Sequence, residues 1–386
     1  MSSVVPAPAP VSTPDAGEIR DRLAGARPLL PVVAATAEGV WVADVEGRRY
    51  LDLSSSSGAL TFGHRHPALL AVATEQLARA TFASRALGND RSGGFAAALA
   101  ELAGVEVALP VSTADEALDI AVAAALAAAG RRAGHDGRAD AASVVVATGS
   151  HDRLVAAGAR TVAFGDAAAL VAALGDDVAA VVLEPVQVEA GVVAPAADYL
   201  GAVRAACAER GVVFVLDETR SGLGRTGDTL APLVGAEAPD LRLLGPALGG
   251  GIVPSAAVLG SREMLGAVGA AASGSLLAAA IGHRVVELLG TGEIQTRARA
   301  LAEHLAARVE ALVGAGATAA RTAGVWAGID IDPGAGSAAD LARRLVARGV
   351  LVDVAGESTI VLSPPLVIRA TELDWAVEQV RVVLAA

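Results

Sequence analysis

Short apolar runs that alternate with helical segments constrain the fold of this chain most strongly. Residues 212–216, Ser143–Ala147 and Val178–Leu183 are each too short for a stable helix. Runs of this length, bounded by polar residues, are typical of strands buried on both faces of a parallel sheet. Helical periodicity at 199–209 supplies a crossover back to the next strand. We therefore predict an α/β chain with a mostly parallel, doubly wound sheet.

The stretch that follows residues 212–216 predicts a ligand site. Asp217 and Glu218 stand at the carboxyl end of this strand, where open α/β sheets place their ligands. A glycine-rich turn comes next, then a second short strand at Leu241–Leu244, then Gly-Pro-Ala-Leu and three glycines. Because ligands bind at the carboxyl ends of parallel strands, these two strand ends predict a ligand site at one edge of the sheet.

Residues 212–255 resemble the cofactor core of the class III aminotransferases, most closely the ornithine and acetylornithine aminotransferase group. The family pattern is a strand, Asp-Glu, Gly-x-Gly-Arg-Thr-Gly, a second strand, Leu-Gly-Lys-Ala-Leu and a glycine run; this chain has LDETRSGLGRTG and LLGPALGGG. The resemblance extends over residues 40–384. It implies the fold type I architecture of the pyridoxal phosphate (PLP) transferases, with a large α/β domain and a small α+β domain. By this resemblance, residues 29–75 and 286–386 form the small domain and 76–285 the large domain. Residues 1–28 are rich in proline and alanine and are expected to be a mobile lead.

The chain contains no lysine, so all 30 Lys+Arg positions are arginine. In the family the lysine carries the cofactor as a Schiff base, and Pro246 stands in its place. A Schiff base needs a primary amine whose pKa the site can lower, and a guanidinium, which stays protonated, cannot serve. We therefore predict that the chain is not a PLP transaminase by itself. No cofactor is expected, unless PLP or pyridoxamine phosphate (PMP) binds without a covalent bond.

Other positions at which the resemblance implies cofactor contacts have also changed. The phosphate cup keeps a hydroxyl at Thr113, but Ala114 replaces the glycine that lets phosphate approach. Capping of the following helix by Ser112 or Thr113 is the simpler interpretation. Elsewhere a serine replaces the ring-stacking aromatic and a leucine replaces the threonine that reaches across the dimer. The degenerate cofactor site comprises Thr113, Ala114, Ser150, Asp217, Pro246 and Leu276.

Four side chains are candidates for catalysis without a Schiff base, namely Asp217, Arg220, His151 and Glu189. By the resemblance, Asp217 matches the aspartate that pairs with the pyridinium nitrogen and Glu189 a glutamate near the substrate. His151 is interpreted as a general base or a solvated loop residue. We expect Arg220 to fold into the vacated pocket and pair with Asp217, because a buried carboxylate and a buried guanidinium each need a partner.

Several classes of function are disfavoured. His64 and His66 have no carboxylate or cysteine beside them in the sequence, so we interpret them as structural and predict no metal site. A net charge of −12 argues against nucleic-acid binding. The single Cys207 excludes an internal disulfide and suits a reducing compartment, and no apolar run is long enough to span a membrane. A cytoplasmic protein is expected.

Two functions remain open. The first is a catalytically degenerate pseudoenzyme, an accessory subunit that dimerises with itself or with a lysine-bearing homologue. The alternative is a PLP-independent enzyme that reuses the family's site for acid–base chemistry on a small, amino-acid-derived molecule, by cyclisation, condensation or elimination.

Two further segments predict local structure. Residues 40–52 alternate apolar and polar side chains around Glu46-Gly47, which predicts a hairpin. Ser337 directly precedes a helical segment at 338–348 and is predicted to cap it.

Overall fold

The computed structural model describes residues 30–81, 88–132, 143–233, 237–266, 268 and 275–385. The predicted lead at residues 1–28 lies outside the described part of the chain. No helix in the described part is long and apolar enough to cross a membrane.

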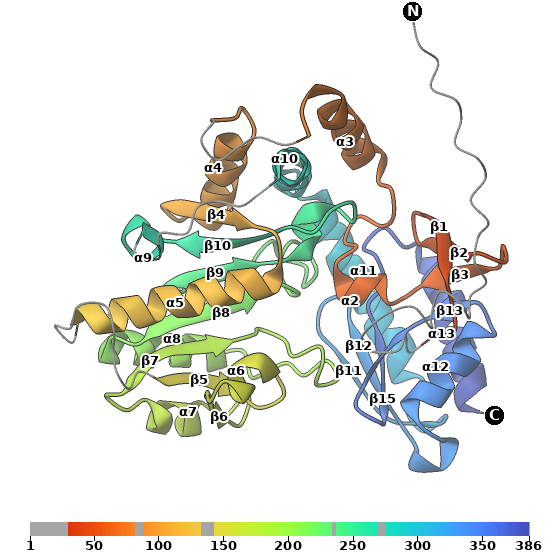
Figure 1. The fold of residues 1–386 in the computed structure, drawn as a ribbon. Coiled ribbons are helices and arrows are strands. Elements are labelled where there is room, and N and C mark those ends of the chain that lie inside the picture. Colours follow the sequence, from red (N-terminus) through yellow and green to blue (C-terminus); the bar gives the residue numbers. More distant parts are fainter. Residues whose placement is uncertain are drawn as a thin grey trace, which may run out of the picture.

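A seven-stranded sheet forms the centre of the larger of two bodies (Figure 1). Its order is β4 (Val107–Val111), β10 (Ala256–Gly260), β9 (Leu241–Leu244), β8 (Val213–Glu218), β7 (Val178–Leu183), β5 (Ser143–Ala147) and β6 (Arg160–Val162). Neighbouring strands from β9 to β6 are parallel, while β10 runs antiparallel to both β4 and β9. The predicted mostly parallel sheet is confirmed.

Helices cover both faces of this sheet because its central strands are apolar on both sides. Val213 and Val215 of β8 pack with α5 (Ala114–Arg132), whereas Phe214 and Leu216 pack with α7 (Ala167–Ala173) and α8 (Tyr199–Arg210). On the face that β10 turns away from α5, three further helices pack together through an apolar cluster. These helices are α3 (Pro67–Arg79), α4 (Ser92–Ala103) and α10 (Leu276–Gly290).

The smaller body joins the two ends of the described chain (Figure 1). One sheet has the order β1 (Ala34–Glu38), β2 (Trp41–Asp44), β3 (Arg49–Asp52) and β13 (Val350–Leu351). The other has the order β11 (Ala317–Thr322), β12 (Ala327–Ile331), β15 (Thr359–Leu362) and β14 (Asp353–Ala355). These sheets pack with α11 (Glu293–Glu310), α12 (Ala338–Val346) and α13 (Ala370–Leu384).

Both local predictions for this body are confirmed. The strands β2 and β3 form an antiparallel hairpin across the Glu46-Gly47 turn. The Ser337 hydroxyl accepts a hydrogen bond of 3.1 Å from the Asp340 amide at the start of α12.

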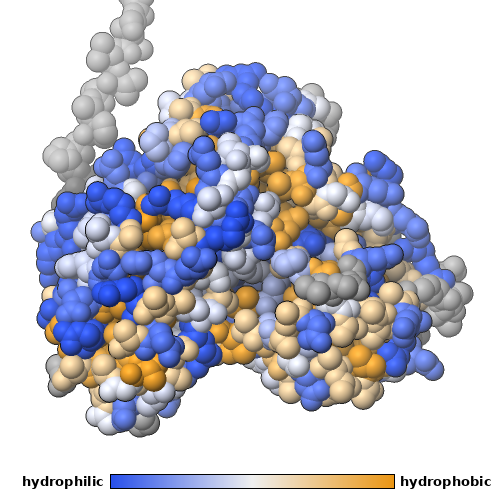
Figure 2. Space-filling model, turned by 180° about the vertical axis from the view of Figure 1, so that it is seen from behind, coloured by the Kyte–Doolittle hydropathy of each residue, from blue (hydrophilic) through white to orange (hydrophobic). Residues whose placement is uncertain are grey.

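Several contacts join the bodies, and two of them lie near the ends of β7 and β8. The fully buried Arg225 donates to the carbonyl oxygens of Gly58, Val325 and Pro364. The loop after β7 also packs on the smaller body, with Gly191 touching β12 so closely that a Cβ at Gly328 would lie 2.1 Å from the Gly191 oxygen. The two bodies are therefore held together at the edge where β7 and β8 end. On the face opposite to Figure 1, a notch separates them and apolar side chains lie in several separate patches (Figure 2).

Candidate functional site

The two acids at the end of β8 have different environments. Glu218 points away from the candidate site, where it pairs with Arg242 and accepts a hydrogen bond of 2.5 Å from the Ala231 amide. Asp217 is 8% exposed and accepts hydrogen bonds from His151 Nε2 at 3.1 Å and from the Thr219 amide at 2.9 Å. Because alternate strand residues face opposite sides of a sheet, only Asp217 serves the candidate site.

His151 connects Asp217 to Ser150. The chain turns sharply after β5, with Gly149 at φ +85° and His151 at φ +56°, and this turn aims the imidazole back at the end of β8. Its Nδ1 lies 2.6 Å from the Ser150 hydroxyl, so serine, imidazole and carboxylate form one hydrogen-bonded chain. Burial disfavours the imidazolium, but the hydrogen bond and charge of Asp217 raise the pKa of His151 above its ordinary value. Burial likewise opposes ionisation of Asp217, and His151 nevertheless holds the pKa of Asp217 below its ordinary value.

The expected pairing of Arg220 with Asp217 is wrong. Arg220 forms an ion pair with Glu189, and its side chain remains 26% exposed beside that 69% exposed carboxylate. The physical reason is that Asp217 already has hydrogen bonds with His151 and Thr219. A further ion pair with Arg220 would therefore not offset the cost of burying the guanidinium. The four predicted catalytic residues are thus brought together as two separate pairs.

Two acids near these pairs have no hydrogen-bond or ion-pair partner among the described residues: Glu184, directly after β7, and Asp353 on β14. Burial, assisted by the negative charge of Asp217, raises the pKa of Glu184 to about 7. Burial and the charge of Asp52 raise the pKa of Asp353 to about 6. An acid that titrates near neutrality, such as Glu184, can donate and accept protons at physiological pH.

Gln187 adds a buried donor to the same loop. Its side chain is 2% exposed, and its Nε2 has no hydrogen-bond partner in the described chain. Its Oε1 lies close to Gly149, where an added Cβ would come within 3.1 Å. The turn that carries His151 therefore packs directly on the loop that carries Glu184 and Glu189.

The residues of the degenerate cofactor site occupy ordinary structural positions. Thr113 caps α5, because its hydroxyl accepts a hydrogen bond of 3.1 Å from the Glu116 amide, so the capping interpretation is confirmed for Thr113. Ala114 is the first residue of α5. Leu276 is the first residue of α10 and is buried. Pro246 begins a short 3₁₀ turn after β9, directly after Gly245, whose backbone lies against Thr219.

The two histidines of the Gly-His-Arg-His-Pro segment have separate roles. His64 Nε2 lies 3.0 Å from Asp52, and His66 makes an edge contact with Phe62. In the part of the chain that the structure describes, no three His, Cys, Asp or Glu side chains are arranged to hold a metal ion.

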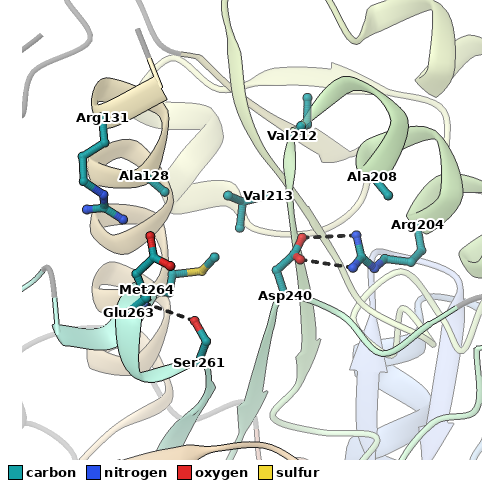
Figure 3. Close-up of a pocket in the computed structure, with 11 residues that line it drawn as sticks. Ala128, Arg131, Arg204, Ala208, Val212, Val213, Asp240, Ser261, Glu263 and Met264 are labelled. Carbon is teal, nitrogen blue, oxygen red and sulfur yellow. Dashed lines mark hydrogen bonds and ion pairs between the residues drawn. The ribbon is translucent and has the colours of Figure 1, made fainter. Parts of the chain in front are cut away.

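A cavity of about 550 Å³ lies at the opposite, amino-terminal edge of the sheet (Figure 3). Arg204 and Asp240 form an ion pair of 3.1 Å on one side of it, and Arg131, Glu263 and Met264 lie on the other. None of the predicted site residues lines this cavity.

Asp353 and Gln187 were missed as site residues by sequence reasoning, and Glu184 was not among its four catalytic candidates. A signal existed for Asp353, which interrupts the apolar segment VLVDVA. Gln187 matches the glutamine of the family's Glu-Pro-x-Gln segment, but its unpartnered amide depends on how the loop after β7 packs against Gly149.

Comparisons with known proteins agree over nearly the whole chain. The family model described as aminotransferase class-III matches residues 24–163 and 157–384. An ornithine aminotransferase of Macrococcus caseolyticus (strain JCSC5402) is 33% identical over 92% of this chain and 94% of its own length. The Plasmodium falciparum ornithine delta-aminotransferase structure has a TM-score of 0.87 at 29% identity, covering 95% of this chain and 96% of that one. An acetylornithine aminotransferase structure from Elizabethkingia anophelis has a TM-score of 0.86 at 28% identity, covering 96% and 99%.

Proposed function

This chain belongs to the class III aminotransferase family, and from that membership we propose that it is a homologue that does not transaminate on its own. It serves as an accessory subunit that dimerises with itself or with a lysine-bearing homologue. The observation that carries this proposal is the absence of lysine from all 386 residues. The family depends on PLP, and without an ε-amino group the chain cannot form the internal Schiff base.

The residues present do not fit the cofactor. The Thr113 hydroxyl, which the resemblance assigns to phosphate, is engaged in capping α5. The first turn of that helix carries Asp115 and Glu116, whose negative charges oppose a phosphate at the position where a helix would otherwise favour it. Asp217 already accepts hydrogen bonds from His151 and Thr219, so its charge is balanced within the protein. These contacts support a site that holds no PLP or PMP.

Titration of the purified chain with PLP tests this proposal, with a lysine-bearing class III enzyme as the control. We expect no aldimine absorbance and no exchange of amino groups between an amino acid and a 2-oxo acid. Tight cofactor binding together with turnover by the chain alone would refute the proposal. Co-expression with a lysine-bearing homologue from the same genome tests the accessory role, since a stable mixed dimer is expected.

A second candidate function is a PLP-independent acid–base enzyme. The hydrogen-bonded chain Ser150–His151–Asp217 favours it, because both ring nitrogens of the imidazole are held by partners, and Glu184 near it has a pKa of about 7. An imidazole and a carboxyl group with raised pKa values can serve as an acid and a base. Turnover of an amino-acid-derived substrate by the isolated chain, lost in His151→Gln and Glu184→Gln but kept in Glu263→Gln, would favour this function over the accessory role.

A further inference from the structure

A second cavity, of about 250 Å³, lies apart from the candidate site. It lies between α4 and α10 on one side and β4 and β10 on the other, and these four elements are grouped at one end of the larger body (Figure 1). None of the residues discussed as catalytic or cofactor-binding lines it. Its walls are Ser92, Gly93, Phe95, Ala96, Ala108, Pro110, Val111, Ser255, Ala278 and Ala279.

Small side chains create this cavity. Five of the ten lining residues are glycine or alanine, and the one aromatic wall is fixed in place. The Phe95 ring lies against α10 so closely that a Cβ at Gly282 would come within 2.4 Å of it. The ring therefore cannot swing across to fill the space beside Ala278 and Ala279.

The chemistry of the walls selects the ligand. No charged side chain of a described residue lines the cavity, although the chain carries a net charge of −12. An ion would have to leave its hydration shell without finding a counter-charge, so the walls exclude ionic ligands. Apolar walls with few polar groups are typical of sites for small molecules.

Ser255 supplies a polar group with no partner. It is 2% exposed and lines the cavity, and its hydroxyl makes no hydrogen bond to any residue that the structure describes. The residue is buried as a whole, but its oxygen is not among the buried side-chain atoms that lack a partner, so it can be reached by a molecule in the cavity. A ligand that carries a hydroxyl or carbonyl group would provide the missing partner.

We propose that this cavity binds a small neutral molecule with a hydrocarbon body and one hydroxyl or carbonyl group that bonds to Ser255. An apolar cavity of about 150 Å³ can take benzene, so the larger volume here fits a ring with a short substituent. This site does not depend on the function proposed above, because it uses none of the same residues.

Benzyl alcohol and toluene are the matched probes, since they differ by one hydroxyl group. With the full chain we expect benzyl alcohol to bind with a Kd of about 1 mM or tighter. It should bind about fivefold more tightly than toluene, the usual effect of one added hydrogen bond. Binding is measured by calorimetry and by chemical-shift changes.

Three variants separate the contributions. Ser255→Ala should abolish the preference for benzyl alcohol while leaving toluene binding intact. Ala96→Leu, which fills the cavity, should weaken the binding of both probes more than tenfold, whereas Ala97→Leu, on the exposed side of the same helix, should change the binding of neither.

The proposal is overturned if neither probe binds, if Ser255→Ala keeps the preference, or if Ala96→Leu and Ala97→Leu behave alike. The proposal would also be overturned if the probes bound only at protein concentrations at which the chain is monomeric. The cavity would then be covered by the second copy in the dimer and would be part of the interface.

Discussion

Glu184 shows how a single buried acid makes stability depend on pH. Its carboxyl group has no hydrogen-bond or ion-pair partner in the described chain, and burial raises its pKa from 4.5 to about 7. Between these values the folded chain binds the proton more tightly than the unfolded chain does. The contribution of Glu184 to stability is therefore present in full below pH 4.5 and is lost as the pH rises to about 7.

Replacing Glu184 with glutamine should reverse this loss. The amide mimics the protonated acid, so the free energy of unfolding at pH 8 is expected to rise by on the order of 2 kcal/mol, with little change at pH 4. Urea denaturation at both pH values measures the difference, and the exposed Glu263→Gln serves as the control. A Glu184→Gln chain no more stable than wild type at pH 8 would contradict the raised pKa.

The partner of Asp217 can be identified by a double-mutant cycle. Removing His151 leaves the buried Asp217 carboxylate with only the Thr219 amide as a partner, so His151→Ala should cost about 3–5 kcal/mol with Asp217 present and much less with Asp217→Asn. Arg220→Met removes a partly exposed pair with Glu189 and should cost about 1 kcal/mol or less. Its coupling to Asp217→Asn should be close to zero. A larger coupling of Asp217 to Arg220 than to His151 would restore the original expectation.

The residue scale is also where the sequence was least informative. The resemblance identified Asp217, yet its partner His151 lies 66 residues away and reaches it only because of a left-handed turn after β5. No local pattern predicts that a non-glycine residue will adopt φ +56°. Arg220 was an attractive partner because it is near in sequence, but the direction of its side chain is set by Glu189.

At the scale of elements, helix α5 is capped by the Thr113 hydroxyl, which the family resemblance assigns to the cofactor phosphate. Thr113→Ala is expected to lower the free energy of unfolding by about 1 kcal/mol, because the Glu116 amide loses its acceptor. Ser112→Ala is the matched control and should have a smaller effect, since Ser112 contributes only its backbone amide, which donates to the Glu116 side chain. Chemical denaturation compares the two, and equal losses would argue against the cap.

The predictable strands share one property, which is that they are apolar on both faces. Strands β5, β7 and β9 were predicted with the bounds that the structure shows. Strands β4 and β10 were not predicted as strands. β4 contains Pro110, which is tolerated there because β4 lies at the edge of the sheet and pairs only with β10. β10 runs antiparallel to its neighbours, so the alternation of strands and helices gives no sign of it.

At the scale of the whole molecule, Arg225 acts as a buried connection between the two bodies. Its guanidinium donates to three carbonyl oxygens from segments distant in sequence and lies over the Trp326 ring at 5.5 Å. No carboxylate pairs with it in the described chain, and burial lowers its pKa to about 9. Its stabilising role therefore depends on the planar arrangement of its donors.

Arg225→Lys should be strongly destabilising even though it conserves the charge. A lysine cannot reach three separate carbonyl groups and would lose its proton more readily in this setting, so a loss of about 3 kcal/mol or more is expected. Thermal unfolding measures it, with Arg299→Lys as the control because Arg299 is bonded to the same turn, at Gly227, from the protein surface. Similar melting temperatures for the two variants would show that the connection is not needed.

The close contact between Gly191 and Gly328 determines how the two bodies can move. The loop after β7 follows the smaller body, since Arg321 Nε also donates to the Gly191 oxygen at 3.1 Å and Val186 and Val188 pack with Trp326. A separation of the bodies that started between β7 and this loop would expose Glu184, which lies directly after β7. Hydration of this carboxyl group would lower its pKa towards the ordinary value, so that at neutral pH the separation and the release of a proton would occur together.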